Sequence, residues 1–507
     1  MRPWSRWALF CGWAVCTALG CDGPAAGDSA SLPPGLWTGG AGRLDGDRPD
    51  WNILQLDIPE GGPKVRGQRI DILGRGETLS VETKGDTVRL ESKLNGKTLH
   101  CEARVEGERR LTGLCENAGR ELTLDLLRIE PIPPGRLDGW TGIWERADGG
   151  RLFLRPGSNG LSMLELPEGT RRTLYSVSPT RFVAGPRIAV PHPHEATYDF
   201  SSDDSLRITD AQGNSVMAKR TEAFRTEPMS IEVEGATLQG TLTLPHAKPP
   251  HPAILWVHGS GRANRSGAGW WPLFFADHGY AVLAVDKRGV GESSGTYELP
   301  DGGHDNYPHM RRRSRDVLTT LRALAAREDI RSDRVGLVGG SQAGWVIPMA
   351  SDTGEVAFTI TLSGGATPVD VEGRFSDWAG EMDATSDSID ALIERLRKYK
   401  PTGHDFTEDF AAQTAPGLWL YGGLDRSNPS LLCVEMIEGL RKTAGKDFTT
   451  RFFPSGNHGL MDARIGGMAE YGALQRQVPG LYEAIVEWMS AHGLLAPTEA
   501  EAEQKKT

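Results

Sequence analysis

Residues 334–345 read RVGLVGGSQAGW, and this stretch decides how the second half of the 507-residue chain folds. It is an apolar strand pattern that runs through small residues around Ser341 and then into a helical pattern. A turn this tight strains the backbone of the serine and leaves room only for small neighbours. We therefore expect an elbow whose small flanking residues are Gly339, Gly340 and Ala343.

Such an elbow would make Ser341 a nucleophile. The turn lifts the serine hydroxyl above the edge of the sheet, close to the N-terminus of a helix. There the backbone N–H of Gln342 points at an oxygen that gains negative charge on an attacked carbonyl. The alternative interpretation is an ordinary glycine-rich turn between a strand and a helix.

A second donor for that oxygen is expected upstream, where residues 254–261 read ILWVHGSG. This is a buried strand that ends in a loop bracketed by glycines. The N–H of Ser260 is the candidate donor and Gly261 is the reserve. His258 lies at the end of the strand, so we expect its imidazole to brace the loop and not to act as a base.

Apolar runs alternate with helical patterns from about Met229 onward, which predicts an α/β domain with a mostly parallel sheet between helices. We place this domain at residues 225–495. The expected buried strands lie at residues 253–258, 281–286, 335–339, 358–362, 418–421 and 450–453.

Residues 364–416 separate two of these strands by too long a gap for a simple connection. Within the gap, Ile389, Leu392, Ile393 and Leu396 have helical spacing. We expect a helical cap inserted above the sheet.

The N-terminal half, residues 35–224, consists of short alternating apolar runs separated by glycine-bearing turns, which predicts strands. The tripeptide Trp-Thr-Gly occurs at Trp37 and again at Trp140, and each copy opens a long β-rich segment. Two β-units in tandem, at 35–131 and 139–224, are therefore a possible organisation.

The composition excludes some partners. Lys and Arg number 56 against 67 Asp and Glu, which gives a net charge of −11 and makes nucleic acid an unsuitable partner. Charged residues at 24% and hydrophobic residues at 38% are typical of a globular protein and not of a polytopic membrane protein.

The N-terminus resembles an export signal. Residues 1–20 combine arginines with a short apolar stretch, and the sequence Ala-Leu-Gly-Cys at residues 18–21 resembles the lipobox of bacterial lipoproteins. That resemblance implies a lipid on Cys21 and a cell-envelope location at a membrane surface, with a plain cleaved signal as the alternative. We interpret residues 21–34 as a linker and 496–507 as a loose tail.

The six cysteines fit an exported chain. Two of these cysteines lie in the predicted signal and would leave with it, and Cys21 is the proposed lipid anchor. A hairpin that turns near residue 108 would place Cys101 opposite Cys115, where they could form a disulfide outside the cytoplasm. Cys433 falls in an expected helix, residues 430–440, and fits a small core residue.

The chain from about Met229 to Leu494 resembles the α/β-hydrolase superfamily, in particular bacterial serine esterases with an N-terminal β-domain. The marks of the resemblance are three segments: 258–261 (HGSG), 286–291 (DKRGVG) and 339–343 (GGSQA). Ala343 stands where glycine is commoner, and its small side chain is still compatible with the turn. The resemblance covers roughly half of the protein.

That superfamily orders its catalytic residues as serine, acid and histidine. Downstream of Ser341, an expected strand opens into a glycine loop that ends at Asp425, and the next strand opens into a loop that contains His458. The resemblance implies that His458 accepts the proton of Ser341 and that Asp425 orients the imidazole. A loop-capping aspartate and a surface histidine are the alternatives. Asp286 is a rival acid, but we expect it to fix the turn that follows it.

Other clusters carry weaker signals. His192 and His194 alternate with prolines, and we interpret them as loop residues and not as a metal site. Residues 311–315 (RRRSR) open an expected helix and are interpreted as a solvated face, with attraction of an anionic substrate or lipid headgroup as the alternative. Neither a metal nor an organic cofactor is implied.

The sequence therefore predicts an envelope-anchored serine hydrolase that cleaves small-molecule carboxylic esters through an acyl-serine intermediate. The resemblance favours an esterase over a peptidase. The peptidase branch usually carries a large β-propeller, and the residues that precede this domain are too few to form one. An acyltransferase or thioesterase could use the same three residues. A non-enzymatic alternative is a lipoprotein whose β-half binds an envelope ligand.

Overall fold

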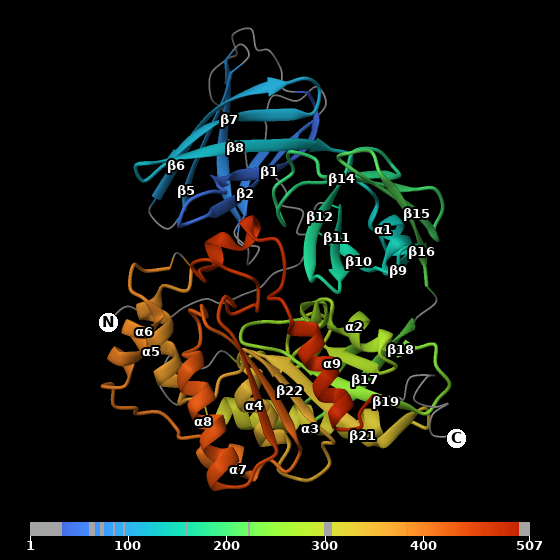
Figure 1. Cartoon of the computed structure of the whole chain (residues 1–507), viewed down its shortest axis with the longest axis vertical. Coiled ribbons are helices and arrows are strands. Elements are labelled where there is room, and N and C mark those ends of the chain that lie inside the picture. Colours follow the sequence, from blue (N-terminus) through green and yellow to red (C-terminus); the bar gives the residue numbers. More distant parts are fainter. Residues whose placement is uncertain are drawn as a thin grey trace.

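Two closed β-barrels lie at one end of the molecule and an α/β domain lies at the other (Figure 1). The structure is a computed structural model. It describes residues 33–59, 66–70, 76–84, 87–94, 97–157, 160–221, 224–298, 307–382 and 384–495.

The first barrel is an eight-stranded meander in which each strand pairs with the next and β8 closes back onto β1. Every second side chain of a strand points to the same face, so alternating apolar residues point into the barrel. Leu54 and Leu56 of β2 are two such residues, and both are fully buried. Trp37 lies in the middle of this core. The strands are β1 (Gly35–Arg43), β2 (Asp50–Ile58), β3 (Arg66–Ile70), β4 (Gly76–Lys84), β5 (Thr87–Leu94), β6 (Lys97–Glu106), β7 (Arg110–Asn117) and β8 (Arg120–Ile129).

The second barrel is formed by β9 to β16, with β16 pairing back onto β9. Its core is aromatic: Trp140 stacks on Phe200 with ring centroids 4.4 Å apart, and Phe182 meets both rings edge-on. Trp140 ends the short helix α1 (Pro134–Trp140), which packs on this barrel. The strands are β9 (Gly142–Arg146), β10 (Arg151–Gly157), β11 (Gly160–Leu166), β12 (Thr170–Ser176), β13 (Arg181–Ala184), β14 (Ala196–Phe200), β15 (Ser205–Asp210) and β16 (Ser215–Arg220).

A disulfide joins Cys101 to Cys115, which lie directly opposite each other in the register of β6 and β7. Among the described residues, Cys433 is the one free cysteine, and it is buried.

Removing this disulfide in the double variant Cys101→Ala/Cys115→Ala is expected to destabilise the first barrel by about 3 kcal/mol, because the bond closes a short loop in the unfolded chain. Thermal unfolding of oxidised wild type and variant measures the effect. Adding reductant should lower the Tm of the wild type and leave the variant unchanged. Alkylation of both cysteines in folded protein without reductant would contradict the prediction.

The α/β domain is built on an eight-stranded sheet in the order β17-β18-β20-β19-β21-β22-β23-β24. β18 runs antiparallel to both of its neighbours, β17 and β20, and the six strands from β19 to β24 are parallel. This confirms the predicted fold class. The strands are β17 (Phe224–Val233), β18 (Ala236–Pro245), β19 (His251–Val257), β20 (Ala281–Val285), β21 (Ile330–Gly340), β22 (Thr359–Leu362), β23 (Gly417–Gly422) and β24 (Phe448–Phe453).

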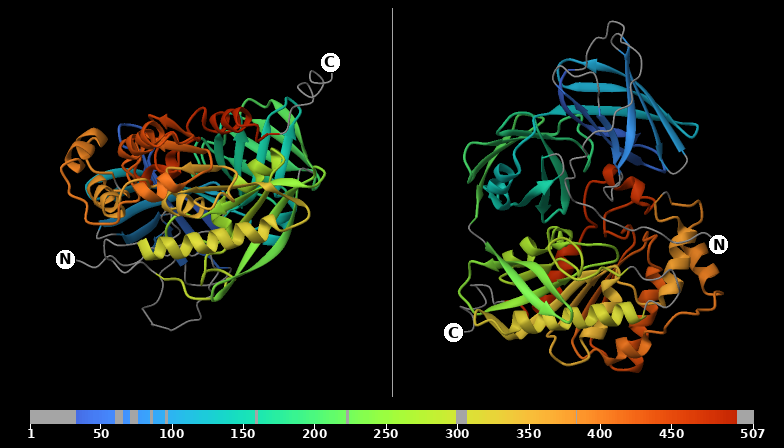
Figure 2. Two further views of the ribbon diagram at one scale, coloured as in Figure 1. Left: turned by 90° about the horizontal axis from the view of Figure 1, so that it is seen from below. Right: turned by 180° about the vertical axis from the view of Figure 1, so that it is seen from behind.

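Helices cover both faces of this sheet, and two apolar clusters fill the spaces between (Figure 2). One face packs against α3 (Tyr307–Ala325), α4 (Ala343–Ala350) and α8 (Ser430–Thr443). The other packs against α2 (Trp271–Asp277) and α9 (Leu481–Ala491). The strands are apolar on both faces for this reason.

Helix α3 begins at Tyr307, so the basic run 311–315 lies inside it, and the periodic residues from Val317 mark only its second half. Arginine has a high helix propensity, which lets the helix extend through this run.

Three helices of the described chain lie between β22 and β23: α5 (Val369–Ala379), α6 (Ile389–Leu396) and α7 (Thr407–Ala412). The cap consists of α5 and α6, which pack on each other, whereas α7 packs on α4 in the core of the α/β domain. Leu392, Ile393 and Leu396 of α6 pack against Phe375 of α5, which accounts for their helical spacing. The hydroxyl of Ser388 caps α6 by accepting the N–H of Ala391.

Both barrels contact the segment that follows the last strand of the sheet. The 3₁₀ helix η2 (Met468–Ala473) packs on β2, where Gly472 lies against Trp51. The indole of Trp51 donates to the carbonyl of Ala189 in the second barrel at 3.0 Å. Arg48 donates to the carbonyl of Ala384 in the cap at 2.8 Å. The first barrel therefore holds the cap and the segment after His458.

The predicted signal at residues 1–20, Cys21 with nearly all of the linker, and the tail 496–507 lie outside the described residues. Within the described part of the chain, no helix has the length and apolarity that a bilayer span requires.

Candidate active site

Ser341 lies at the turn between β21 and α4 with a positive φ of 57°. This left-handed conformation is costly for a residue with a side chain and marks a functional strain. Three backbone hydrogen bonds maintain it: the N–H of Ser341 donates to the carbonyl of Leu362 at 3.1 Å, and the carbonyl of Ser341 accepts from the N–H groups of Gly344 and Gly365 at 2.9 and 3.1 Å. The turn is a strained elbow of the kind that presents a nucleophile.

The small neighbours of the serine are required by close backbone approaches. A Cβ at Gly339 would lie 2.2 Å from the carbonyl oxygen of Val257 and 2.8 Å from the Cβ of Ala343. A Cβ at Gly340 would lie 2.9 Å from the carbonyl oxygen of Leu362. Larger residues would push the turn away from the neighbouring strands.

Asp425 and His458 meet at the same edge of the sheet. Asp425 follows β23 and His458 follows β24, and these strands are adjacent and parallel, so their carboxyl ends lie together. The Nδ1 of His458 lies 2.9 Å from one carboxylate oxygen of Asp425 and 3.1 Å from the other. The Asp425 carboxylate is buried and also accepts the N–H groups of Ser427 and Asn428 at 2.8 and 2.9 Å.

Ser341 directly follows β21, which lies two places along the sheet from β23. All three predicted catalytic residues therefore lie at the carboxyl edge of the parallel strands. The hydrogen bonds among the described residues join His458 to Asp425 but do not join Ser341 to His458. The pairing of serine and histidine therefore stays a prediction.

Electrostatics at this edge favour a charged imidazole. Burial opposes the charge on His458, but the carboxylate of Asp425 outweighs it and raises the pKa of His458 to about 9. Glu381 and Glu372 add to this effect. Burial, then the charge of Glu381, raises the pKa of Glu372 to about 8.

Sequence reasoning missed these two glutamates. Glu372 lies in the first turn of α5, and Glu381 follows that helix and accepts a hydrogen bond from the hydroxyl of Ser427 at 2.5 Å. Both come from the cap, whose packing over the sheet has no local signature. The length of the 364–416 gap was the one available signal.

The loop at residues 258–261 lies against the serine. A Cβ at Gly259 would be 3.1 Å from the Cβ of Ser341 and 3.6 Å from its Oγ. Gly261 has a φ of 75°, a left-handed conformation that glycine adopts without strain. The described residues include no hydrogen-bond acceptor for the N–H groups of Gln342 and Ser260, so both predicted donors are free.

His258 braces this loop from behind. Its Nε2 lies 2.8 Å from the carbonyl oxygen of Val285 at the end of β20. Burial, aided by the charge of Lys287, lowers the pKa of His258 to about 3, so its imidazole is neutral at physiological pH.

Asp286 has a structural environment. Its carboxylate accepts three hydrogen bonds from Arg265 at 2.7 to 3.0 Å and one from the N–H of Glu292 at 2.9 Å. It thus holds the turn after β20 and is fully engaged there.

The remaining sequence candidates lie elsewhere. His192 contacts Asp125 of the first barrel at 2.9 Å and stacks on His194, so the Pro-His-Pro-His segment lies at the junction of the two barrels. Cys433 is fully buried in α8. Among the described residues, no three or more His, Cys, Asp or Glu side chains lie together so that they could hold a metal ion.

Comparisons with known proteins concern the family and the fold of the C-terminal half. Residues 267–490 match the model of the prolyl oligopeptidase family. An esterase of Pyrococcus furiosus has 16% identity and a TM-score of 0.36, with 53% of this chain and 88% of that chain covered. An esterase of the archaeon Pyrobaculum calidifontis has 15% identity and a TM-score of 0.36, with 52% of this chain and 83% of that chain covered. A thermophilic carboxylesterase cloned from a metagenomic library has 19% identity and a TM-score of 0.37, with 54% of this chain and 90% of that chain covered.

The sheet order and the family match together give the C-terminal half the α/β-hydrolase fold, which confirms the fold that the resemblance in the sequence implied. Within this half, residues 267–490 are similar to the prolyl oligopeptidase family.

Proposed function

We propose that this protein hydrolyses carboxylic esters through an acyl-enzyme on Ser341. The observation that carries the proposal is the strained elbow of Ser341 at the sheet edge that also holds the buried Asp425–His458 pair. A serine hydroxyl is a weak nucleophile and needs a base beside it. The edge supplies an imidazole whose second nitrogen is already oriented by a carboxylate.

The mechanism follows from proton transfer. Neutral His458 accepts the hydroxyl proton as Ser341 attacks the ester carbonyl, and Asp425 stabilises the imidazolium that forms. The N–H groups of Gln342 and Ser260 bind the oxyanion. The imidazolium then gives its proton to the departing alcohol, and water repeats the sequence to release the acid.

A peptidase is the second candidate, because the family match includes the prolyl oligopeptidases. Two eight-stranded barrels precede this domain in place of a propeller, which supports the esterase. An acyltransferase or thioesterase would use the same residues and differ in the nucleophile that reaches the acyl-enzyme.

A substrate panel tests the choice. We expect purified protein to cleave p-nitrophenyl esters of short and long acyl chains and to leave matched p-nitroanilides and proline-containing peptides intact, with Ser341→Ala as the blank. Faster cleavage of an anilide or peptide than of its ester would replace the esterase by the peptidase. Acyl transfer to an added alcohol or amine in preference to water would replace it by the transferase.

The pH profile should reflect the raised pKa of His458. Because only the neutral imidazole accepts a proton, kcat/KM is expected to rise with pH to a plateau above about 9. Glu381→Gln removes a charge that raises this pKa, so its ascending limb should move to lower pH. The control is Glu394→Gln, an exposed glutamate of α6 that pairs with Arg397. An unshifted limb in Glu381→Gln would contradict this account.

We also propose that the chain is held at an envelope membrane by a lipid on Cys21. The supporting feature is the lipobox-like sequence at residues 18–21. Expressed in bacteria, wild type should fractionate with membranes and Cys21→Ser with the soluble fraction. Equal amounts of both proteins in the soluble fraction would argue for a plain cleaved signal.

A further inference from the structure

We propose that Lys287 and Arg313 are positioning residues that clamp the oxyanion loop, 258–261, so that the N–H groups of Gly259 and Ser260 face the acyl carbonyl on Ser341. This inference rests on the proposed function. It assigns a purpose to two charged side chains that lie behind the loop and belong to neither the predicted triad nor its predicted donors.

The clamp is a set of charged donors on the loop carbonyls. The ammonium of Lys287 donates to the carbonyl of Gly259 and, at 2.7 Å, to that of Gly261. The guanidinium of Arg313 donates to the carbonyl of His258 at 2.7 Å. Its other terminal nitrogen donates to the side-chain oxygen of Gln342, the residue that supplies the first oxyanion donor.

The geometry of the peptide unit turns these contacts into an orientation. In a trans peptide the C=O and the following N–H point in nearly opposite directions. Arg313 on the carbonyl of His258 therefore directs the N–H of Gly259 away from itself, and Lys287 on the carbonyl of Gly259 does the same for the N–H of Ser260. Since Gly259 lies against Ser341, these N–H groups face the side of the loop on which the serine lies.

Charge reinforces the orientation. A cation at the carbonyl end of a peptide polarises the unit and strengthens its N–H as a donor. It also places positive charge behind the position where the oxyanion forms, in surroundings that screen it poorly.

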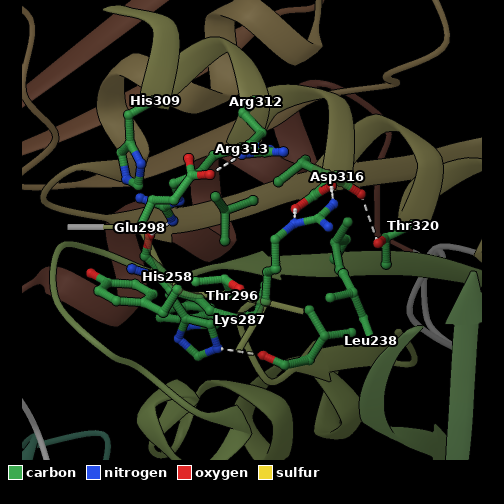
Figure 3. Close-up of a pocket in the computed structure, with 17 residues that line it drawn as sticks. Leu238, His258, Lys287, Thr296, Glu298, His309, Arg312, Arg313, Asp316 and Thr320 are labelled. Atoms are coloured by element: carbon green, nitrogen blue, oxygen red, sulfur yellow. Dashed lines mark hydrogen bonds and ion pairs between the residues drawn. The ribbon is translucent and has the colours of Figure 1, made fainter. Parts of the chain in front are cut away.

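The same two cations lack an ion-pair partner in the part of the chain that the structure describes. Lys287 and Arg313 line a pocket together with two further arginines, Arg288 and Arg312. Each of these two has a carboxylate partner: Arg288 pairs with Asp316, and Arg312 pairs with Glu298. Figure 3 labels Arg312 and its partner Glu298 together with Lys287 and Arg313. Among the described residues, neither Lys287 nor Arg313 has a carboxylate within ion-pair distance.

Keeping these cations has a cost in stability. Burial and the charge of Arg313 lower the pKa of Lys287 well below its usual value. Burial also lowers the pKa of Arg313, to about 10. Desolvated cations with no ion-pair partner among the described residues oppose folding, so an apolar replacement should be tolerated by the fold. A contribution to the transition state accounts for retaining them.

The test separates rate from stability. In Lys287→Met and Arg313→Met we expect kcat for a p-nitrophenyl ester to fall about 10- to 100-fold, somewhat less than the loss of a whole oxyanion donor. KM should change little. Affinity for a boronic acid that mimics the tetrahedral intermediate should fall by the same factor as kcat, and Tm should stay within about 4 °C of wild type. Arg313→Lys should recover part of the rate.

Arg312→Met is the matched control, since it removes the neighbouring arginine, which lines the same pocket but contacts no loop carbonyl. Unchanged kcat in both methionine variants would overturn the inference, and so would a loss that follows a large fall in Tm. If wild type itself neither turns over esters nor reacts with a fluorophosphonate at Ser341, the proposed function fails and the inference fails with it. Normal wild-type turnover with unaffected variants overturns the inference alone.

Discussion

Ser341→Ala is expected to lower kcat for ester hydrolysis by about 10⁶-fold, which is the effect of removing the nucleophile in a serine hydrolase. The fold should be unaffected, because the turn imposes a φ of 57° on the residue and alanine tolerates it no worse than serine. Stopped and continuous assays of p-nitrophenyl ester cleavage, with enzyme stripped of contaminating esterases, measure the loss. The residual rate reports the oxyanion loop alone.

Ser363→Ala is the matched control for this variant. Ser363 also has a positive φ, 47°, and follows β22, the strand beside the elbow strand. Its hydroxyl is buried and has no hydrogen-bond partner among the described residues. Its removal should leave kcat near that of wild type. If instead Ser341→Ala keeps more than about a tenth of the activity, the elbow serine is not the nucleophile.

Asp425→Asn is expected to lower kcat by about 10⁴-fold with little change in fold. Asp425 accepts the N–H groups of Ser427 and Asn428 through one carboxylate oxygen, and an amide oxygen would keep these two bonds. The amide NH₂ would then face Nδ1 of His458. That contact stabilises the tautomer with its proton on Nε2, which cannot accept the proton of Ser341.

The same substitution also removes the charge that raises the pKa of His458, so residual activity should reach its plateau at lower pH than in wild type. The control is Asp447→Asn, because Asp447 forms another aspartate–histidine contact, 3.6 Å from His492, in an exposed position. That variant should match wild type. A loss of less than about tenfold in Asp425→Asn would show that another carboxylate orients the imidazole.

The sequence predicted the parts of the site that depend on local structure. The elbow is such a part, because the small residues at Gly339 and Ala343 are required by contacts within the turn and its adjacent strand. Asp425 and His458 each follow a strand directly, so an apolar run followed by a glycine loop locates them. The helical cap was predictable from the spacing of Leu392, Ile393 and Leu396.

Other parts depend on packing between distant segments. Glu372 and Glu381 reach His458 only because the cap folds over the sheet edge. Lys287 and Arg313 meet the loop at 258–261 from the end of β20 and from the inside of α3, and no sequence spacing relates them.

The closure of each β-rich unit into a barrel is non-local in the same sense. A strand pattern over β1 does not show that β8 is its second neighbour. The contact between His192 and Asp125 likewise joins two barrels that a linear pattern treats separately.

The central claim is that Ser341 is an activated nucleophile, and mass spectrometry after treatment of folded protein, from residue 30 onward, with a fluorophosphonate tests it most directly. The account predicts one covalent adduct, on Ser341, which forms in wild type and is absent in His458→Ala under the same conditions. An adduct on another serine, or none in well-folded wild-type protein, would contradict it.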